Sequence, residues 1–466
     1  MAQLPVITMP TGAPAAPTTA APEPERRRVA RLLHRAGFGD KVEVIDQWAA
    51  KGYVATVDHL LSFPPASTRP DETVRVAQEG SAPANELDGY DITPLARMWL
   101  SRMAATQHPL EEKLTLYWHN HLATAFSKVR RPRLMVAQNR LLRDHAGGNF
   151  RALAKAITAD AAMLYWLDGN TNQLAAPNEN YGREFMELFT LGKDRYTQED
   201  VRQAARAFTG YTVDNQGTVT FHPELHDQGE KVILGHRGNF GPLDVADVVL
   251  DDHPDGPVGA RYVAQRLAGF LYRPDPEPEV VEAMAGAFAG SGYEIKPMVR
   301  VLLLRPEFSD GPGVTIKSPA EFVAGAMRAL GLVATPTLQA KFRELDELAA
   351  FCAAMGQELY NPPTWPAGRA EPPGPTPPPP CPGTTSRPGW PGSSPTTRWA
   401  PCWPPPAASP GRPPARGWTA SASSSWSPPP IRPWPATSTS PPPQGPTHPP
   451  GPGACSPSCW PPPTTT

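Results

Sequence analysis

The stretch PLEEKLTLYWHNHLATAFSKV, residues 109–129, carries the strongest helical pattern in the chain. Pro109 suits the first position of a helix, because the N–H that proline lacks would have no partner there. Glu111 and Glu112 follow in the first turn and Lys128 stands near the end, which is the charge order that a helix dipole favours. We therefore predict a helix that begins at Pro109.

Helical patterns continue outward from this stretch on both sides. Apolar residues recur at spacings of three and four, which is typical of helices that bury one face. Thr197 and Asp200 resemble a capping box for the helix that follows them. The other predicted helices cover residues 26–36, 41–51, 54–61, 94–108, 133–145, 149–167, 181–191, 244–250, 258–272, 278–289, 296–304, 319–330 and 337–355.

One segment departs from the helical pattern. In YTVDNQGTVTFH, residues 211–222, two runs of strand-forming residues flank Asp214-Asn215-Gln216-Gly217, which is typical of a hairpin turn. A glycine-rich loop follows from Pro223 to Pro242. The predicted fold is therefore all-α, mainly helical, with one β-hairpin and a Gly-rich loop, in a domain over residues 26–365.

The two ends of the chain differ from this domain. Residues 1–25 are predicted to be a disordered arm, because the first 22 are rich in Pro and Ala. They lack the charged region and apolar run of a secretory signal, so the sequence as given predicts a cytoplasmic protein. Export would be expected if the start codon were assigned wrongly.

Residues 366–466 are predicted to be a disordered, low-complexity tail. From Pro372 onward the chain has no Leu, Val, Met, Phe, Tyr, Lys, Asn, Asp or Glu, yet it has seven Trp. Such a composition arises when a GC-rich gene is read out of phase, because proline codons are rich in C. The alternative is a genuine Pro-rich linker. Out-of-phase reading predicts that the tail packs on nothing and that the helical domain exposes an apolar patch.

Charge and cysteine content exclude several classes of protein. From Pro372 onward the tail holds five Arg and no acid, so residues 1–371 have 38 basic and 45 acidic residues. An acidic protein without a basic block gives no basis for nucleic-acid binding. Only Cys352 lies outside the tail, which excludes a disulfide framework. No apolar run is long enough for a membrane span.

Seven short blocks resemble, in order and spacing, the bacterial family known as domain of unknown function 1800. The resemblance implies a largely helical bacterial protein without an established activity, often exported. It also implies a partner, because the gene often lies beside one for domain of unknown function 1501. After Pro363 the family continues differently from Trp365-Pro366-Ala367-Gly368. The blocks are residues 31–39 (RLLHRAGFG), 118–121 (WHNH), 178–184 (NENYGRE) with 186–188 (MEL), 205–210 (ARAFTG), 226–227 (HD) with Lys231, 317–319 (KSP), and 355–357 (MGQ) with 361–363 (NPP).

His119 and His121 form the first candidate site. Residues two apart point about 200° apart on a regular α-helix, so the two rings cannot chelate one metal ion from such a helix. They could do so from a distorted segment. The alternative is that one histidine faces the core with a hydrogen bond and the other lies near the surface.

Glu179, Arg183, Glu184 and Glu187 form the second candidate site. Their spacings of three and four place them on one helical surface beside an apolar core. Two neighbouring carboxylates raise each other's pKa or bind a cation. The alternative is a solvated surface with ion pairs that contribute little stability.

His226, Asp227 and Lys231 form the third candidate site, on the Gly-rich loop. A His beside an Asp serves as a metal ligand pair or as an acid–base pair. The alternative is an exposed loop histidine without a functional role.

Two functions remain open on this evidence. The first is a metal-assisted hydrolase in which His119, His121 and His226 join Glu184, Glu187 and Asp227 around zinc, manganese or iron. The second is a non-enzymatic scaffold in which these groups form a buried polar network. The absence of nucleophile-elbow, P-loop and H-E-x-x-H motifs favours the scaffold.

Overall fold

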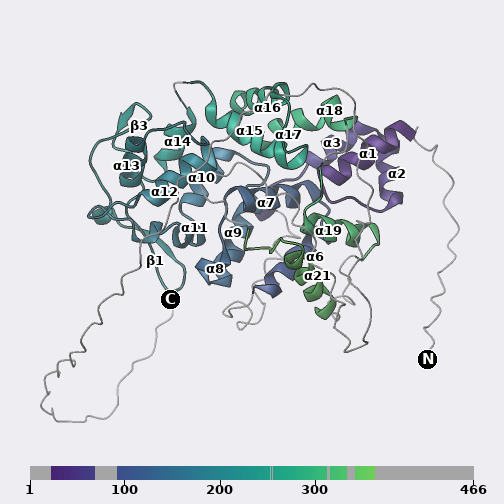
Figure 1. Ribbon diagram of the computed structural model, residues 1–466, viewed down its shortest axis with the longest axis horizontal. Helices are drawn as coiled ribbons and strands as arrows, with labels where there is room; N and C mark the ends of the chain where they lie inside the picture. Colours follow the sequence, from purple (N-terminus) through teal and green to yellow (C-terminus); the bar gives the residue numbers. More distant parts are fainter. Residues whose placement is uncertain are drawn as a thin grey trace, which may run out of the picture. The chain divides into compact units, whose positions relative to one another are not determined.

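The computed structural model describes residues 23–68, 92–251, 253, 255–311, 315–332 and 342–362 (Figure 1). All of them belong to the first of two units into which the chain divides, Met1–Pro380 and Cys381–Thr466. Residues 1–22 and the predicted tail lie outside the described residues, so the predictions made for them stay predictions.

The described residues confirm a mainly helical fold. Three helices are short, namely α8 (Phe126–Val129), α11 (Ala161–Trp166) and α18 (Pro306–Ser309). The longer helices of the N-terminal part are α1 (Glu23–Arg35), α2 (Val42–Lys51), α3 (Tyr53–Leu61), α6 (Thr93–Ala105), α7 (Pro109–His121), α9 (Pro132–Asp144) and α10 (Phe150–Thr158). They are followed by α12 (Glu179–Glu184), a π-helix η3 (Phe185–Thr190), α13 (Gln198–Ala207), α14 (Asp244–Asp251), α15 (Val258–Leu271), α16 (Pro278–Gly290), α17 (Ile295–Leu303), α19 (Pro319–Ala329) and α21 (Phe342–Ala354).

Several predicted helices are shorter than the sequence pattern indicated. The segment from Pro109 breaks after His121, and the chain re-enters a single turn as α8 (Phe126–Val129). The predicted helix over 149–167 is two helices, because the Asp160 carboxylate caps the N–H of Met163 and starts α11 (Ala161–Trp166). α1 begins at Glu23, so residues 23–25 are helical and not part of a disordered arm.

The predicted hairpin is present, and a second one follows it. β1 (Tyr211–Val213) pairs antiparallel with β2 (Val219–Phe221). The Gly-rich loop, however, contains β3 (Lys231–Ile233) paired with β4 (His236–Gly238), so the prediction of one hairpin was incomplete. Leu234 and Gly235 both have positive φ, as a two-residue turn between antiparallel strands requires.

α7 lies among the other helices and is buried on almost every side (Figure 1). Leu110, Leu114 and Trp118 belong to one apolar cluster, whereas Leu116 belongs to a second one. The helix therefore separates two parts of the core, and its polar residues must also be accommodated inside the protein.

The charged residues of the first turn of α7 are buried and paired, not placed at the surface to match the dipole. Glu112 Oε1 accepts hydrogen bonds from Nε of Arg102 on α6 and from Nε of Arg143 on α9, both at 2.6 Å. Trp99 Nε1 donates to Glu112 Oε2 at 3.1 Å. Burial opposes ionisation, but the charges of Arg143 and Arg102 outweigh it and lower the pKa of Glu112 to about 2. Three helices therefore meet at one carboxylate.

The neighbouring Lys113 is also buried and forms an ion pair with Glu321 of α19. In the described part of the chain, no helix combines the length and apolar character that crossing a membrane requires.

We predict that Glu112→Gln lowers the free energy of unfolding by about 3–5 kcal/mol, because it leaves two buried guanidinium groups without their shared carboxylate. Denaturant titration followed by circular dichroism measures the change. Glu282→Gln is the matched control, since Glu282 pairs with Arg261 at the surface at 2.8 Å, and it should cost less than about 1 kcal/mol. Equal losses in the two variants would contradict the central role of Glu112.

Candidate functional site

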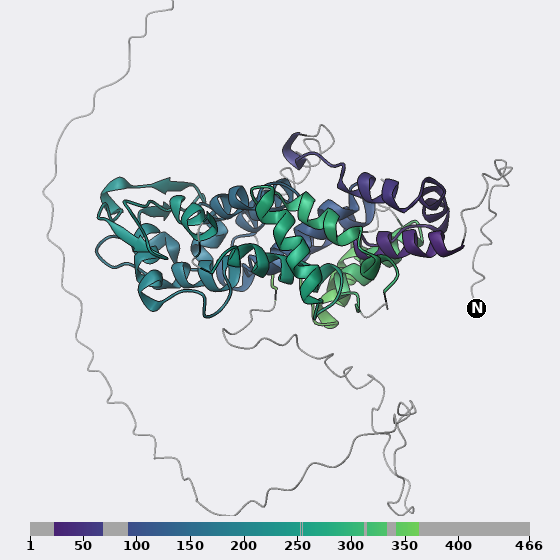
Figure 2. The ribbon, with the colours of Figure 1, turned by 90° about the horizontal axis from the view of Figure 1, so that it is seen from above.

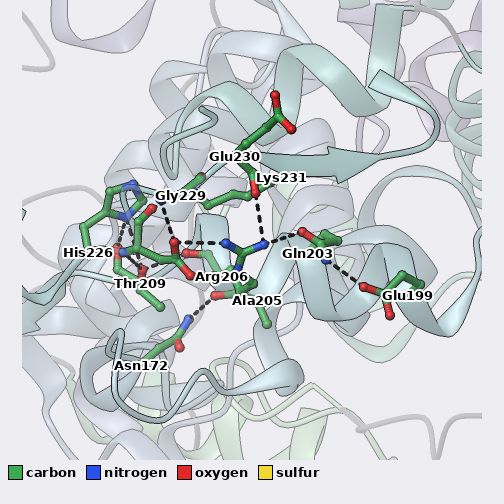
Figure 3. Close-up of polar contacts among 11 residues, drawn as sticks. Asn172, Glu199, Gln203, Ala205, Arg206, Thr209, His226, Gly229, Glu230 and Lys231 are labelled. Carbon is green, nitrogen blue, oxygen red and sulfur yellow. Dashed lines mark hydrogen bonds and ion pairs between the residues drawn. The ribbon is translucent and has the colours of Figure 1, made fainter. Parts of the chain in front are cut away.

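The third candidate site is held together by an ion pair between α13 and the loop after β2 (Figure 3). Arg206 Nε donates to Asp227 Oδ2 at 2.7 Å, and Nη2 donates to Asp227 Oδ1 at 3.1 Å. These hydrogen bonds hold the pKa of the Asp227 carboxyl below its usual range. Arg206 Nη1 also donates to Gln203 Oε1 and to the carbonyl of Glu230, at 2.7 and 3.1 Å. The loop is therefore fixed to α13, and Asp227 is fully engaged.

Lys231 is entirely buried although it begins strand β3. Its Nζ donates to the carbonyl oxygens of Asp227 and Gly229, at 2.5 and 3.0 Å. Burial lowers the pKa of the ammonium group. Because its ammonium group donates to backbone carbonyls of the same loop, Lys231 holds the turn between the two hairpins closed. Figure 3 shows Lys231 beside Gly229 and Arg206.

His226 is buried, and one of its ring nitrogens has a defined protonation. Nδ1 lies 3.0 Å from the carbonyl oxygen of Thr209 and 3.1 Å from its Oγ1. The Thr209 hydroxyl donates to the carbonyl of Arg206, so both oxygens accept from the imidazole. Nδ1 therefore carries the proton, and Nε2 keeps its lone pair. Burial lowers the pKa of His226, which favours the neutral ring.

The second candidate site divides into two parts. Glu179 Oε2 accepts from Arg183 Nη2 at 3.1 Å and from Gln198 Nε2 at 2.6 Å. These contacts join α12 to α13 at a half-exposed surface. Arg183 thus pairs with Glu179 and not with Glu184.

Glu184 and Glu187 lie where the α-helix widens into the π-helix η3. The backbone hydrogen bond from Leu191 N to Met186 O, at 2.8 Å, spans five residues as in a π-helix, and the Thr190 hydroxyl donates to Phe185 O at 2.7 Å. Glu187 Oε2 accepts from the Tyr196 hydroxyl at 2.7 Å.

Glu184 is half-buried and has no hydrogen bond or ion pair to any described residue. Burial and the neighbouring Glu187 charge raise its pKa. Single π-helical turns frequently occur at functional sites, and this one presents a carboxylate that has no partner among the described residues.

Close packing against α15 supports the π-helical turn. The Tyr262 hydroxyl donates to the carbonyl of Leu188 at 3.0 Å. Gly192 has a φ of 85°, and a Cβ there would lie 2.7 Å from the Tyr262 ring. Glycine is therefore required directly after η3, both for its backbone angle and for this contact.

The first candidate site is not a single site, because α7 is regular and its two histidines face different neighbours. The His119 ring lies edge-on to Trp99, with centroids 5.1 Å apart, and its Nε2 is buried without a partner among the described residues. His121 Nε2 donates to the carbonyl of Phe189 in η3 at 2.9 Å. Burial lowers the pKa of His119 to about 4 and that of His121 to about 3, so both are neutral.

The described residues contain no group of three or more His, Cys, Asp or Glu side chains that could hold a metal ion. His121 does contact the backbone of η3, the element that also carries Glu187. His226 contacts Thr209, and His119 contacts Trp99. Neither of these two contacts involves η3. The shared metal site stays a hypothesis that no arrangement of these side chains supports.

Sequence reasoning missed the polar residues that join distant helices. Lys317 Nζ lies 3.1 Å from His34 Nδ1, Gln357 Oε1 accepts from Ala320 N at 2.8 Å, and Asn361 Oδ1 accepts from Ser127 N at 2.8 Å. In the sequence, the only sign of these contacts was that the residues lie in the blocks that resemble the family. Each is a tertiary contact between segments far apart in the chain.

These contacts belong to a helical protein in which short polar motifs join segments that are far apart in the chain. The family model described as "Protein of unknown function (DUF1800)" matches residues 31–370, and the chain belongs to this family. Neither the curated proteins nor the solved structures include a match.

We predict that His119→Phe makes the stability of the protein less sensitive to acid. His119 is neutral in the fold, so below pH 6.5 the unfolded chain binds a proton that the folded chain does not. Stability is therefore lost as the pH falls from 6.5 toward 4, by about 1.4 kcal/mol per pH unit for this histidine. The free energy of unfolding at pH 8 measures the packing cost of the variant. The additional difference between variant and wild type at pH 5 measures the protonation of His119 in the unfolded chain. If the free energy of unfolding depended on pH equally in the variant and the wild type, a neutral His119 would be refuted.

We predict that Glu184→Gln raises the unfolding midpoint at pH 7, because the raised pKa means that the charged carboxylate is less stable in the fold than in the unfolded chain. The gain should shrink as the pH falls and wild-type Glu184 takes up a proton. Glu179→Gln, on the same helix, should instead lower the midpoint because it weakens the contacts to Arg183 and Gln198. A lower midpoint for Glu184→Gln, with loss of bound metal, would favour a ligand role.

Proposed function

We propose that the protein is a non-enzymatic helical scaffold that acts by binding a companion protein. The observation that carries this proposal is the use of the candidate polar groups in internal contacts. Asp227 is engaged by Arg206, Lys231 by two carbonyl oxygens, and Arg183 by Glu179. Catalysis needs groups that are free to touch a substrate, whereas a scaffold needs its surface elements held in place.

A hollow in the described surface lies away from these residues. It has a volume of about 510 Å³ and is lined by parts of α1, α3 and the short helix α18 (Pro306–Ser309). None of the candidate site residues borders it. This separation of cavity and polar residues also supports a scaffold.

The Arg206–Asp227 pair and Lys231 fix the loop between the two hairpins, and the second hairpin packs against α13. Each hairpin presents an apolar side chain outward. Phe221 on β2 and Val232 on β3 are both exposed. We propose this hairpin surface as the part of the scaffold that contacts the companion. The family resemblance suggests a protein of domain of unknown function 1501 as that companion.

A metal-assisted hydrolase is the second candidate function. His226 favours it, because a fixed Nδ1 proton leaves Nε2 ready to accept a proton or bind zinc, manganese or iron. The unpaired carboxylate of Glu184 is the other available group. We rank this function second because the two groups belong to different candidate sites.

We predict that the full chain and a protein of domain of unknown function 1501 from the same organism elute as one complex in size-exclusion chromatography. Val232→Glu should weaken the complex at least tenfold by calorimetry, because it places a charge in an apolar contact. Val42→Glu is the matched control, since Val42 is exposed on α2, and it should leave the affinity unchanged.

The scaffold proposal would be overturned if the purified protein contained stoichiometric metal and formed no complex with the companion, and if the His226→Ala variant lost both the metal and a hydrolytic activity.

A further inference from the structure

The side chain of Asn139, on α9, is buried, and its amide nitrogen has no hydrogen-bond partner among the described residues. The orientation of this amide is fixed, because its Oδ1 accepts a hydrogen bond from Arg143 Nη2 at 2.7 Å. The unpartnered group is therefore the amide nitrogen and not the carbonyl oxygen. Buried donors normally have an acceptor, and none of the described residues supplies one here.

A small cavity lies beside this amide, between α6, α9 and the segment that follows α21. It has a volume of about 10 Å³, which is roughly the space that one water-sized group needs. A phosphate or a carboxylate group is too large for it. The polar lining consists of Trp99, Arg102, Asn139, Arg143 and Tyr360, and the remaining described residues around the cavity are apolar.

The chemistry of this lining suits a group that only accepts hydrogen bonds. Arg102 and Arg143 carry positive charges, and no described residue of the lining carries a negative one. Apart from the Tyr360 hydroxyl and the Asn139 oxygen that is already bonded to Arg143, the described polar side chains of the lining only donate. A water molecule must donate as well as accept, whereas a small anion only accepts. The lining therefore favours an anion over water.

Tyr360 lies at this cavity with an unusual backbone. Its φ is 67°, which residues other than glycine rarely adopt. Its ring centroid lies 5.2 Å from that of Trp99, and its carbonyl accepts from Phe126 N at 2.8 Å. The segment follows α21, which packs against α6 and α19, and the green helices α19 and α21 lie together in both views (Figure 1, Figure 2). Backbone conformations of this kind, held by their surroundings, cluster at ligand sites.

We propose that the cavity binds one monovalent anion of the size of chloride, which accepts a hydrogen bond from the Asn139 amide and is attracted by Arg102 and Arg143. We call these three residues the anion site. The ion joins α6 to α9 beside Glu112 and stabilises the folded chain. The anion site uses none of the residues of the hairpin surface, so it goes beyond the proposed scaffold, and the failure of one proposal leaves the other intact.

Urea unfolding of the full chain in mixed sodium salts is the first test. Chloride replaces methanesulfonate at constant ionic strength, and methanesulfonate is too large for the cavity. Once chloride exceeds its dissociation constant, each tenfold increase should lower the unfolding equilibrium constant about tenfold, as expected for one ion that binds only the folded chain. An unfolding constant that is the same in both salts overturns the proposal.

Asn139→Asp is the second test. The variant keeps an oxygen for Arg143 and replaces the unpartnered amide nitrogen with a carboxylate oxygen, which supplies the negative charge itself. It should lose the dependence on chloride, and in methanesulfonate alone it should be at least as stable as the wild type. Asn215→Asp, in the exposed turn of the first hairpin, is the matched control and should keep the full dependence. A chloride dependence that persists in Asn139→Asp places the bound ion elsewhere and overturns the anion site.

Crystals of the wild-type full chain grown in sodium bromide locate the ion without relying on a variant that folds. Bromide scatters X-rays anomalously, so an anomalous peak should lie within hydrogen-bond distance of Asn139 Nδ2. A peak at this place without anomalous signal would mean a buried water only. Bromide peaks confined to the outer surface would mean an adventitious ion only. Either of these two results overturns the proposal.

Discussion

The Glu112 carboxylate accepts hydrogen bonds from Arg102 and Arg143 inside the protein, and this contact fixes α6, α7 and α9 relative to one another. A buried carboxylate with two guanidinium groups tolerates little displacement, because each lost hydrogen bond leaves a charge in a medium that cannot solvate it. Glu111, Glu112 and Lys113 of α7 are all buried, so none of them reaches solvent. The packing of the surrounding helices must therefore supply their partners, and the position of those helices follows from this requirement.

The same principle explains the internal contacts that several polar residues of these blocks make in the described part of the chain. Asp227 and Lys231 close a loop against α13, Gln357 accepts from α19, and Asn361 accepts from α8. Short polar motifs of this kind suggest catalysis when they are seen in a sequence alone. Once folded, they satisfy backbone and side-chain groups at places where helices and loops meet. A protein built in this way keeps its surface elements in register, which is the property that the proposed scaffold needs.

Two groups stand apart from this pattern. His226 has its proton fixed on Nδ1 by Thr209, and Glu184, at the start of a π-helical turn, has no partner among the described residues. Both are the kinds of residue from which catalytic sites are made, and their environments shift their pKa values in the directions that favour the neutral forms. They belong to different loops and helices, however, and reactive chemistry usually requires two such groups in contact.

The sequence by itself determined the helical class, most helix positions, the first hairpin, the capping box at Thr197 and the family, because these depend on local periodicity, turn residues and short motifs. It also established that His119 and His121 cannot share a metal ion from a regular helix, since that is a property of helix geometry. Only the tertiary structure decided that Glu112 lies between two arginines, that Arg183 pairs with Glu179, and that α19 turns its charges inward. Those outcomes depend on which segments pack together. Spacing along one helix says which residues share a face, but it does not say whether that face meets water or another helix.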